Sequence, residues 1–267
     1  MCWFLLERIA SGQRDITRSS SLKGETNLKY QISIFGDFSH ISPNEDTLKL
    51  CIENFFSIGM LPGSSIQEVD ARTNRLEPRL SLQSIKNGVV ANFLNGRIDF
   101  IAIPISGSPA AALTVKDFVL HVSNVLRIAS DVLGVVYNRI GFVTEKFLRE
   151  LSIDEFTRVR GKFFKDEAVL FPELDNNEWH VRMCSVDDLE APLSQGVNVT
   201  YNLARAHVQI ADQSGQREFD TVHLVVDINT PADKRINGSA ESLEQFLQFA
   251  QEKEVVIQSK IGSMVYE

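Results

Sequence analysis

The chain has 267 residues, 43% of them hydrophobic and 23% charged, which is typical of a globular protein and not of a disordered, collagenous or coiled-coil chain. Its 27 basic and 35 acidic residues give a net charge of −8, which disfavours broad contact with nucleic acid or anionic lipid. We therefore expect neither nucleic acid nor a membrane as a partner.

The N-terminal residues do not resemble a secretory signal, because the only apolar run there is Cys2 to Leu6 and no basic start precedes it. No later apolar run approaches the roughly 18 residues of a membrane-spanning helix. The cysteines are odd in number and far apart, so they predict neither a disulfide framework nor a metal site. These features favour a cytoplasmic protein.

Acidic residues are concentrated in the second part of the chain. Residues 1–150 contain 16 basic and 15 acidic residues, whereas residues 151–267 contain 11 and 20. We interpret residues 151–190 as an acidic connecting segment, since runs of charge are typical of solvated regions. An alternative is a segment that binds a basic protein through its aromatic side chains. These are Phe163, Phe164, Phe171 and Trp179.

The first predicted elements follow a loosely ordered start. Residues 1–28 are rich in serine and glycine and predict little regular structure. Apolar and polar residues alternate from Lys29 to Phe38, which predicts a half-buried strand. Helical spacing of apolar residues then predicts a helix from Asn44 to Ile58, with Asn44 or Ser42 as N-cap and Gly59 as its end.

Two Asn-Gly pairs, Asn87-Gly88 and Asn95-Gly96, separate three short apolar runs. Asn-Gly tolerates the positive φ angles of two-residue type I′ turns, so we predict a three-stranded meander. With such turns the strands pair in two rows on the core face. Leu82, Phe93 and Ile98 form one row, and Ser84, Ala91 and Phe100 form the next.

A long amphipathic helix is predicted next, from Leu113 to Leu133, with Thr114 as N-cap and Gly134 as its end. A strand with the sequence VVYNRIGFV follows. The second half is expected to repeat this order of elements. It contains strands at Val197–Ile210 and Glu218–Asn229, a helix at Ser239–Glu252 and a final strand near Val255–Val265.

A shift of 121 positions aligns residues 97–143 with residues 218–264. It matches a strand, a helix face and a final strand, in which Arg139-Ile140-Gly141 falls on Lys260-Ile261-Gly262. Amphipathic segments also align by chance, so an internal duplication is a hypothesis. We predict an α+β protein of two related halves, residues 29–150 and 191–267, each an antiparallel β-meander with a long helix packed on one face.

The sequence lacks the common catalytic and cofactor-binding motifs, among them GxGxxG, GxSxG, HExxH and CxxC. The five histidines have no metal-ligand spacing, so we predict neither a metal nor a cofactor. Four polar residues of the second hairpin are expected to share one sheet face: Arg205, His207, His223 and Asp227. Together they could bind an anion or perform acid–base chemistry, whereas the alternative is the solvated face of an antiparallel sheet.

Arg139 and Lys260 occupy equivalent positions if the duplication is real. Such a basic pair could close a pseudo-symmetric anion site. The alternative is that each charge protects a strand edge from pairing with another chain.

The strand from Asn138 to Val143 and the sequence Leu224 to Asn229 before the last helix resemble those of an uncharacterised bacterial family. Members of that family have about this length and occur sporadically among genomes. The resemblance spans most of residues 29–265 and implies the α+β architecture and a prokaryotic cytoplasm. The sporadic occurrence implies an accessory role in a mobile or defence-linked gene cluster.

The absence of catalytic motifs and the acidic, aromatic segment favour a non-enzymatic protein-interaction or regulatory protein with a protein partner. Self-association into a homo-oligomer stays open. The alternative is a ligand-binding protein or hydrolase-type enzyme that acts on an anionic small molecule through the polar face of the second hairpin.

Overall fold

The computed structural model describes residues 24–70, 74–105, 107–164, 178–212, 215–236 and 238–267. The elements within these residues are β1 (Thr26–Phe35), α1 (Glu45–Phe55), η1 (Phe56–Ile58), β2 (Met60–Pro62), β3 (Ile66–Asp70), β4 (Arg75–Arg79), β5 (Ser81–Ser84), β6 (Val90–Phe93), β7 (Arg97–Ala102), α2 (Val115–Leu133), β8 (Arg139–Phe147), α3 (Ile153–Phe163), β9 (His180–Leu189), β10 (Gln195–Asp212), β11 (Gly215–Asn229) and α4 (Ala240–Tyr266).

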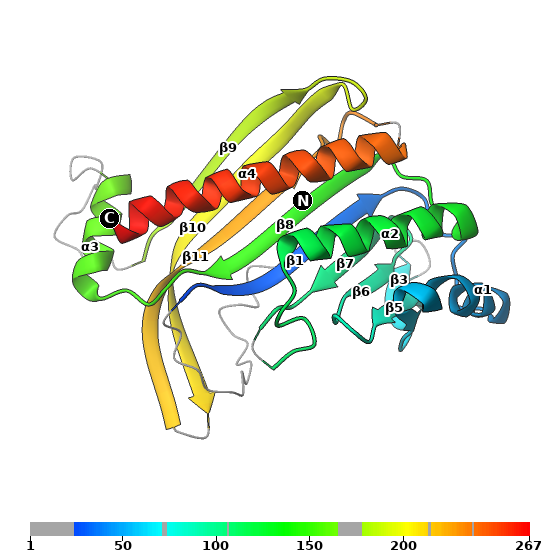
Figure 1. Ribbon diagram of the computed structural model, residues 1–267, viewed down its shortest axis with the longest axis horizontal. Coiled ribbons are helices and arrows are strands. Elements are labelled where there is room, and N and C mark those ends of the chain that lie inside the picture. The colour runs from blue at the N-terminus through cyan, green and yellow to red at the C-terminus, as the bar shows by residue number, and fades with distance from the viewer. Residues whose placement is uncertain (1–23, 71–73, 106, 165–177, 213–214, 237) are drawn as a thin grey trace.

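Nine of the described strands form one antiparallel sheet in the order β2-β5-β6-β7-β1-β8-β11-β10-β9, and β3 and β4 form a separate ribbon (Figure 1). The central strands β1 and β8 therefore join a meander from the first part of the chain to a meander from the second part. The α+β prediction is confirmed, and both meanders belong to one sheet. No helix among the described residues is long and apolar enough to cross a membrane.

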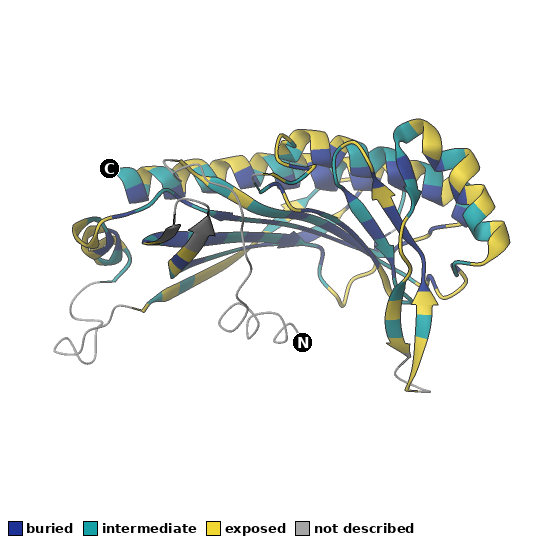
Figure 2. Cartoon of the chain, turned by 90° about the horizontal axis from the view of Figure 1, so that it is seen from below, coloured by how far each residue is buried: buried dark blue, intermediate teal, exposed yellow. Residues whose placement is uncertain are grey.

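The two long helices lie on the same face of this sheet (Figure 2). α2 packs on β1, and α4 packs on β8 and β11 and contacts α2. Alternate side chains of the central strands point into the layer between helices and sheet, as the period of a strand requires. Ile32, Phe142 and Ile228 are fully buried there, together with Phe118 of α2 and Phe246 of α4.

The helix starts follow the capping residues that the sequence predicts. The side chain of Asn44 accepts a hydrogen bond from the backbone N–H of Thr47 (2.9 Å), and Thr114 accepts one from Asp117 (3.1 Å). Gly134 ends α2 with a left-handed φ of 64°. The first two predicted helices are thus confirmed.

The register of the first meander agrees with the prediction on one side only. Phe93 faces Ile98 across β6 and β7, but Ala91, not Phe93, faces Leu82 across β5 and β6. The turn before β6 is longer than two residues, since the N–H of Ser84 bonds the carbonyl of Val89 (2.7 Å). Neither Asn-Gly pair forms a type I′ turn, because Gly88 is the only one of the four residues with positive φ.

The final strand predicted near Val255–Val265 is wrong, because α4 continues to Tyr266. Buried Ile257, Ile261 and Val265 keep helical spacing. Val255 is β-branched, which favours a strand locally, but it is 62% exposed and adds nothing to a strand-like buried face.

This correction separates two residues that the sequence placed in equivalent positions. Arg139 begins strand β8, whereas Lys260 lies on the exposed side of helix α4. The 121-residue shift still matches strand β7 with β11 and buried Val125 with buried Phe246, but its third element fails.

The predicted connecting segment, residues 151–190, contains regular structure in its described parts. Helix α3 occupies its beginning, and β9 pairs along its whole length with β10, from His180 opposite Ala204 to Leu189 opposite Gln195. This stretch therefore supplies the last strand of the sheet.

Candidate interaction surface

We call the sheet face opposite α2 and α4 the open face, because no described helix covers it (Figure 2). Its side chains alternate with those of the buried layer along each strand. Polar groups from six adjacent strands lie on it: Asp99, Gln31, Ser33, Glu145, His223, Asp227, Asn229, Asn198, Thr200, Asn202 and Arg182.

The four polar residues of the second hairpin do not share one face, which corrects the prediction. His223 faces Ala204 across β10 and β11, and His207 faces Asp220. Directly opposed residues point to the same face, and Ala204 and His207 are an odd number of positions apart. His223 and Asp227 therefore lie on the open face, whereas Arg205 and His207 lie on the helix-bearing face.

The error has a physical cause in the pattern of β10. Buried Val197, Val199 and Leu203 occupy odd positions, so the odd row faces the helices. Beyond Leu203 the apolar residues shift to even positions, Ala204 and Val208 among them. The prediction took the even apolar row that follows Leu203 as the core-facing row of the whole strand. It therefore assigned the two faces of β10 the wrong way round.

Arg205 and His207 form a cluster with two carboxylates. Arg205 donates to Asp220 (3.0 Å), and the two ring nitrogens of His207 lie 3.3 Å from Asp220 and 3.5 Å from Glu218. Burial opposes ionisation of Asp220, but hydrogen bonds from Arg205 and His207 outweigh it and lower its pKa. Arg205 also lies over the ring of Phe156 (5.2 Å). This cluster carries its own anions, so it does not favour binding another.

A second cluster on the open face joins β1, β8 and β11. Glu145 lies 2.9 Å from Nε2 of His223 and 3.3 Å from Nζ of Lys29. Burial would raise its pKa, but the hydrogen bond from His223 and the charge of Lys29 lower the pKa of Glu145 to about 2. Phe147 packs its ring edge to face against His223 (5.4 Å). Glu145 is therefore a permanent anion near neutral pH and not a proton donor.

Asp227 lies near the middle of the open face. It accepts a hydrogen bond from the side-chain amide of Asn229 (3.0 Å), which in turn accepts one from Asn198 (3.2 Å). Buried Thr200 faces Asp227 on β10. These two neighbours of Asp227, Asn229 and Thr200, are neutral, whereas Asp99 pairs with Arg97 (2.9 Å).

Arg139 and Lys260 are not brought together. Nε of Arg139 donates to the carbonyl of Thr230 (3.1 Å), and its guanidinium lies over the ring of Phe35 (4.5 Å). Lys260 is exposed on α4, on the other side of the sheet. The structure therefore assembles no pseudo-symmetric basic pair.

Three of the four predicted partner-binding aromatics contact one another. The ring of Trp179 stacks on Phe163 (6.1 Å) and meets Phe164 edge to face (6.4 Å). They fasten the end of α3 to the start of β9. Phe171 lies outside the described residues.

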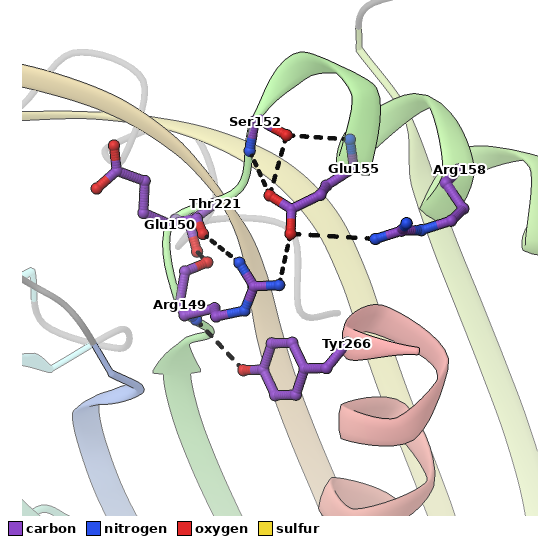
Figure 3. A network of polar contacts seen from close by, with 7 residues as sticks. All are labelled: Arg149, Glu150, Ser152, Glu155, Arg158, Thr221 and Tyr266. Carbon is purple, nitrogen blue, oxygen red and sulfur yellow. Dashed lines mark hydrogen bonds and ion pairs between the residues drawn. The ribbon is translucent and has the colours of Figure 1, made fainter.

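A polar network that the sequence did not indicate holds α3 against the end of α4 (Figure 3). Arg149 donates to Glu155 (2.6 Å), which also completes the capping box of Ser152. The hydrogen bond from Arg149, followed by that from the backbone of Ser152, lowers the pKa of Glu155 to about 2. Arg149 lies over the ring of Tyr266 (5.0 Å), and its N–H donates to the Tyr266 hydroxyl (3.3 Å). The network is structural, because its groups satisfy one another.

Neither a protein-family model nor a curated protein matches the chain. Within the described residues, no group of three or more His, Cys, Asp and Glu side chains is arranged to hold a metal ion. The sequence missed Lys29 and Glu145 as members of the open face. Alternation along β8 places Glu145 on one face of the sheet, but only the neighbouring strands show that Lys29 and His223 lie on the same face.

Proposed function

We propose that this protein is a non-enzymatic protein-interaction or regulatory protein, and that it binds a basic protein partner on the open face. The observation that carries this proposal is the position of Asp227, a carboxylate near the centre of a sheet face that no described helix covers, which accepts a hydrogen bond from the amide of Asn229. Among the described residues no cation forms a salt bridge with Asp227, and a partner's lysine or arginine would supply one.

Charge on the rest of the open face supports the same partner chemistry. Lys29 pairs with Glu145, and Arg97 pairs with Asp99, so these cations are neutralised within the chain. The excess acid of the chain lies in residues 151–267, which supply β9, β10 and β11 to the sheet. A basic protein would therefore be attracted to this half.

The breadth of the face favours a protein over a small molecule. Its polar groups are spread over six strands, and those with side-chain bonds form separate clusters, whereas a small-molecule site needs groups that converge on one point. The alternative site on the second hairpin is split between two faces.

The test is quantitative affinity purification from the organism that encodes the chain, with three forms of the protein as bait. Asp227→Lys is expected to reduce recovery of a specific basic protein at least tenfold, since it places like charges together. Glu244→Lys is the matched control, because Glu244 is exposed on α4 on the opposite side of the sheet. Equal recovery by both variants would contradict the proposal.

The resemblance to a sporadically occurring bacterial family supports an accessory role for such an interaction in a mobile or defence-linked gene cluster. A conserved neighbouring gene for a basic protein would identify the partner. The same purification checks it, because the product of that gene should be the protein lost with Asp227→Lys.

A further inference from the structure

No described strand pairs with the long outer edge of β9. β9 ends the nine-stranded sheet and bonds β10 on its inner side over ten residues. Among the described residues, no backbone hydrogen bond reaches its outer side. Alternate N–H and C=O groups of an edge strand point outward and can pair with another strand. The opposite edge, β2, has only three residues and offers no comparable template.

Apolar side chains on this edge are unusually accessible. Met183 is 52% and Val186 is 61% exposed, and Cys184 between them is exposed as well. Natural edge strands are usually short, bulged or protected by inward-pointing charge. One acidic side chain at this edge, Asp187, is turned to the salt bridge with Lys253 of α4 (2.6 Å).

Charge along β9 changes sign from one end to the other. His180 and Arg182 lie near its start, and Asp187, Asp188 and the following Glu190 lie at its end. Antiparallel pairing of β9 with a second β9 brings each basic end against an acidic end. Parallel pairing would instead place like charges side by side.

We propose that two copies of this chain join through antiparallel β9 strands, with Ser185 of each copy at the twofold axis. In this register Arg182 faces Asp188 of the second copy, and Cys184 faces Val186. The interface is self-complementary, as a twofold dimer requires. It extends the sheet without interruption from one copy to the next, with both open faces on the same side.

The two neighbouring antiparallel registers, centred on residue 184 or residue 186, lose these contacts. A shift by one position on each strand either places Cys184 against Cys184 of the second copy and Arg182 against Val186, or places Cys184 against Asp188. The centred register alone combines the Arg182–Asp188 charge pair with burial of Val186.

Sedimentation equilibrium of the full chain measures this association. The wild-type chain is expected to dimerise, and Arg182→Asp or Asp188→Arg alone is expected to raise the dissociation constant at least tenfold. The double variant with both changes restores the charge pair in swapped order and should return to within a few-fold of wild type. A monomer at about 0.1 mM, or a double variant as weak as the singles, would overturn the proposal.

Disulfide cross-linking tests the register independently. In a Cys2→Ser background, Val186→Cys should form a covalent dimer with Cys184 under mild oxidation, because directly opposed residues lie within disulfide reach. Cys184 without that substitution should not cross-link, since the two copies of Cys184 are diagonal neighbours beyond about 7 Å. Circular dichroism confirms that the variants are folded. Equal cross-linking with and without Val186→Cys would contradict the stated register.

Discussion

Helices α2 and α4 cover the same face of one sheet but bury different side chains. All buried residues of α2 are apolar, from Phe118 to Leu133. α4 begins with buried Ser242 followed by apolar Leu243, Phe246 and Leu247, and further along it buries Glu254. The first helix buries apolar side chains along its whole length, whereas the second half of α4 also buries a carboxylate whose charge needs compensation.

The compensating groups come from the strands below. Lys146 of β8 is 3% exposed. Its ammonium group donates to the carboxylate of Glu25, which precedes β1, and to the side-chain oxygen of Gln258 on α4 (2.7 Å). Thr144 donates to Glu254 (3.4 Å). Burial raises the pKa of Glu254, and Lys146 opposes that rise without reversing it. Each group in this layer therefore needs its neighbours, since an isolated buried charge costs several kcal/mol.

The largest effect is expected from removing the buried cation beneath α4. Lys146→Met leaves Glu254 and Glu25 without their cation and should lower the free energy of unfolding by about 3–5 kcal/mol at neutral pH. The loss should shrink near pH 4, where Glu254 is protonated. Denaturant unfolding at both pH values measures it.

Lys29→Met is the control for this experiment, because Lys29 is half-buried at the open face and pairs with a single carboxylate. Its loss should be about 1 kcal/mol or less. If the two substitutions cost the same, the polar layer under α4 has no special dependence on charge.

Glu254→Gln should have a smaller and opposite effect. A raised pKa means that the folded state resists ionisation, so the penalty is absent below the ordinary pKa of 4.5 and grows as the pH rises above it. Removing the charge should therefore stabilise the protein near pH 7 by on the order of 1 kcal/mol, and leave its stability near pH 4 unchanged. Thermal unfolding across this range checks the sign, and a loss at pH 7 would refute it.

The smallest expected effects sharpen the comparison at the helix starts. Thr114→Ala and Ser239→Ala each remove an N-cap side chain that accepts a backbone N–H, from Asp117 (3.1 Å) and Ser242 (3.2 Å) respectively. Each should cost about 1 kcal/mol in unfolding free energy. If both substitutions lower the unfolding free energy equally, the difference between α2 and α4 is limited to the second half of α4. A much larger loss for Ser239→Ala would mean that the two helices also differ at their starts.

The sequence predicted those elements whose signals are local. Thr114, Gly134 and the helical spacing between them define α2 without any knowledge of the rest of the fold. The end of α4 was missed because Val255 and Val256 favour a strand locally, while the contacts that keep the segment helical come from β8. The tertiary environment overrides propensity there.

The candidate site depended on strand faces, and these were only partly readable. The apolar row of β10 changes from odd to even positions near Leu203, so a single alternation pattern could not assign both ends. His223 and Asp227 keep their common face because β11 has one unbroken apolar row from Val222 to Ile228. The faces of the other side chains depend on which strands pair and in which register, and these are long-range properties of the fold.

The position of β8 has a consequence for synthesis of the chain. β1 to β8 belong to residues 26–147, so six neighbouring strands of the large sheet are complete before β11 is made. The N-terminal part of a chain leaves the ribosome first. During that interval β8 is the growing edge, and its charged residues Glu145 and Lys146 discourage foreign strands from adding there. We therefore expect Lys146, which lies beneath α4 in the folded protein, to hinder pairing of β8 with other chains until β11 pairs with β8.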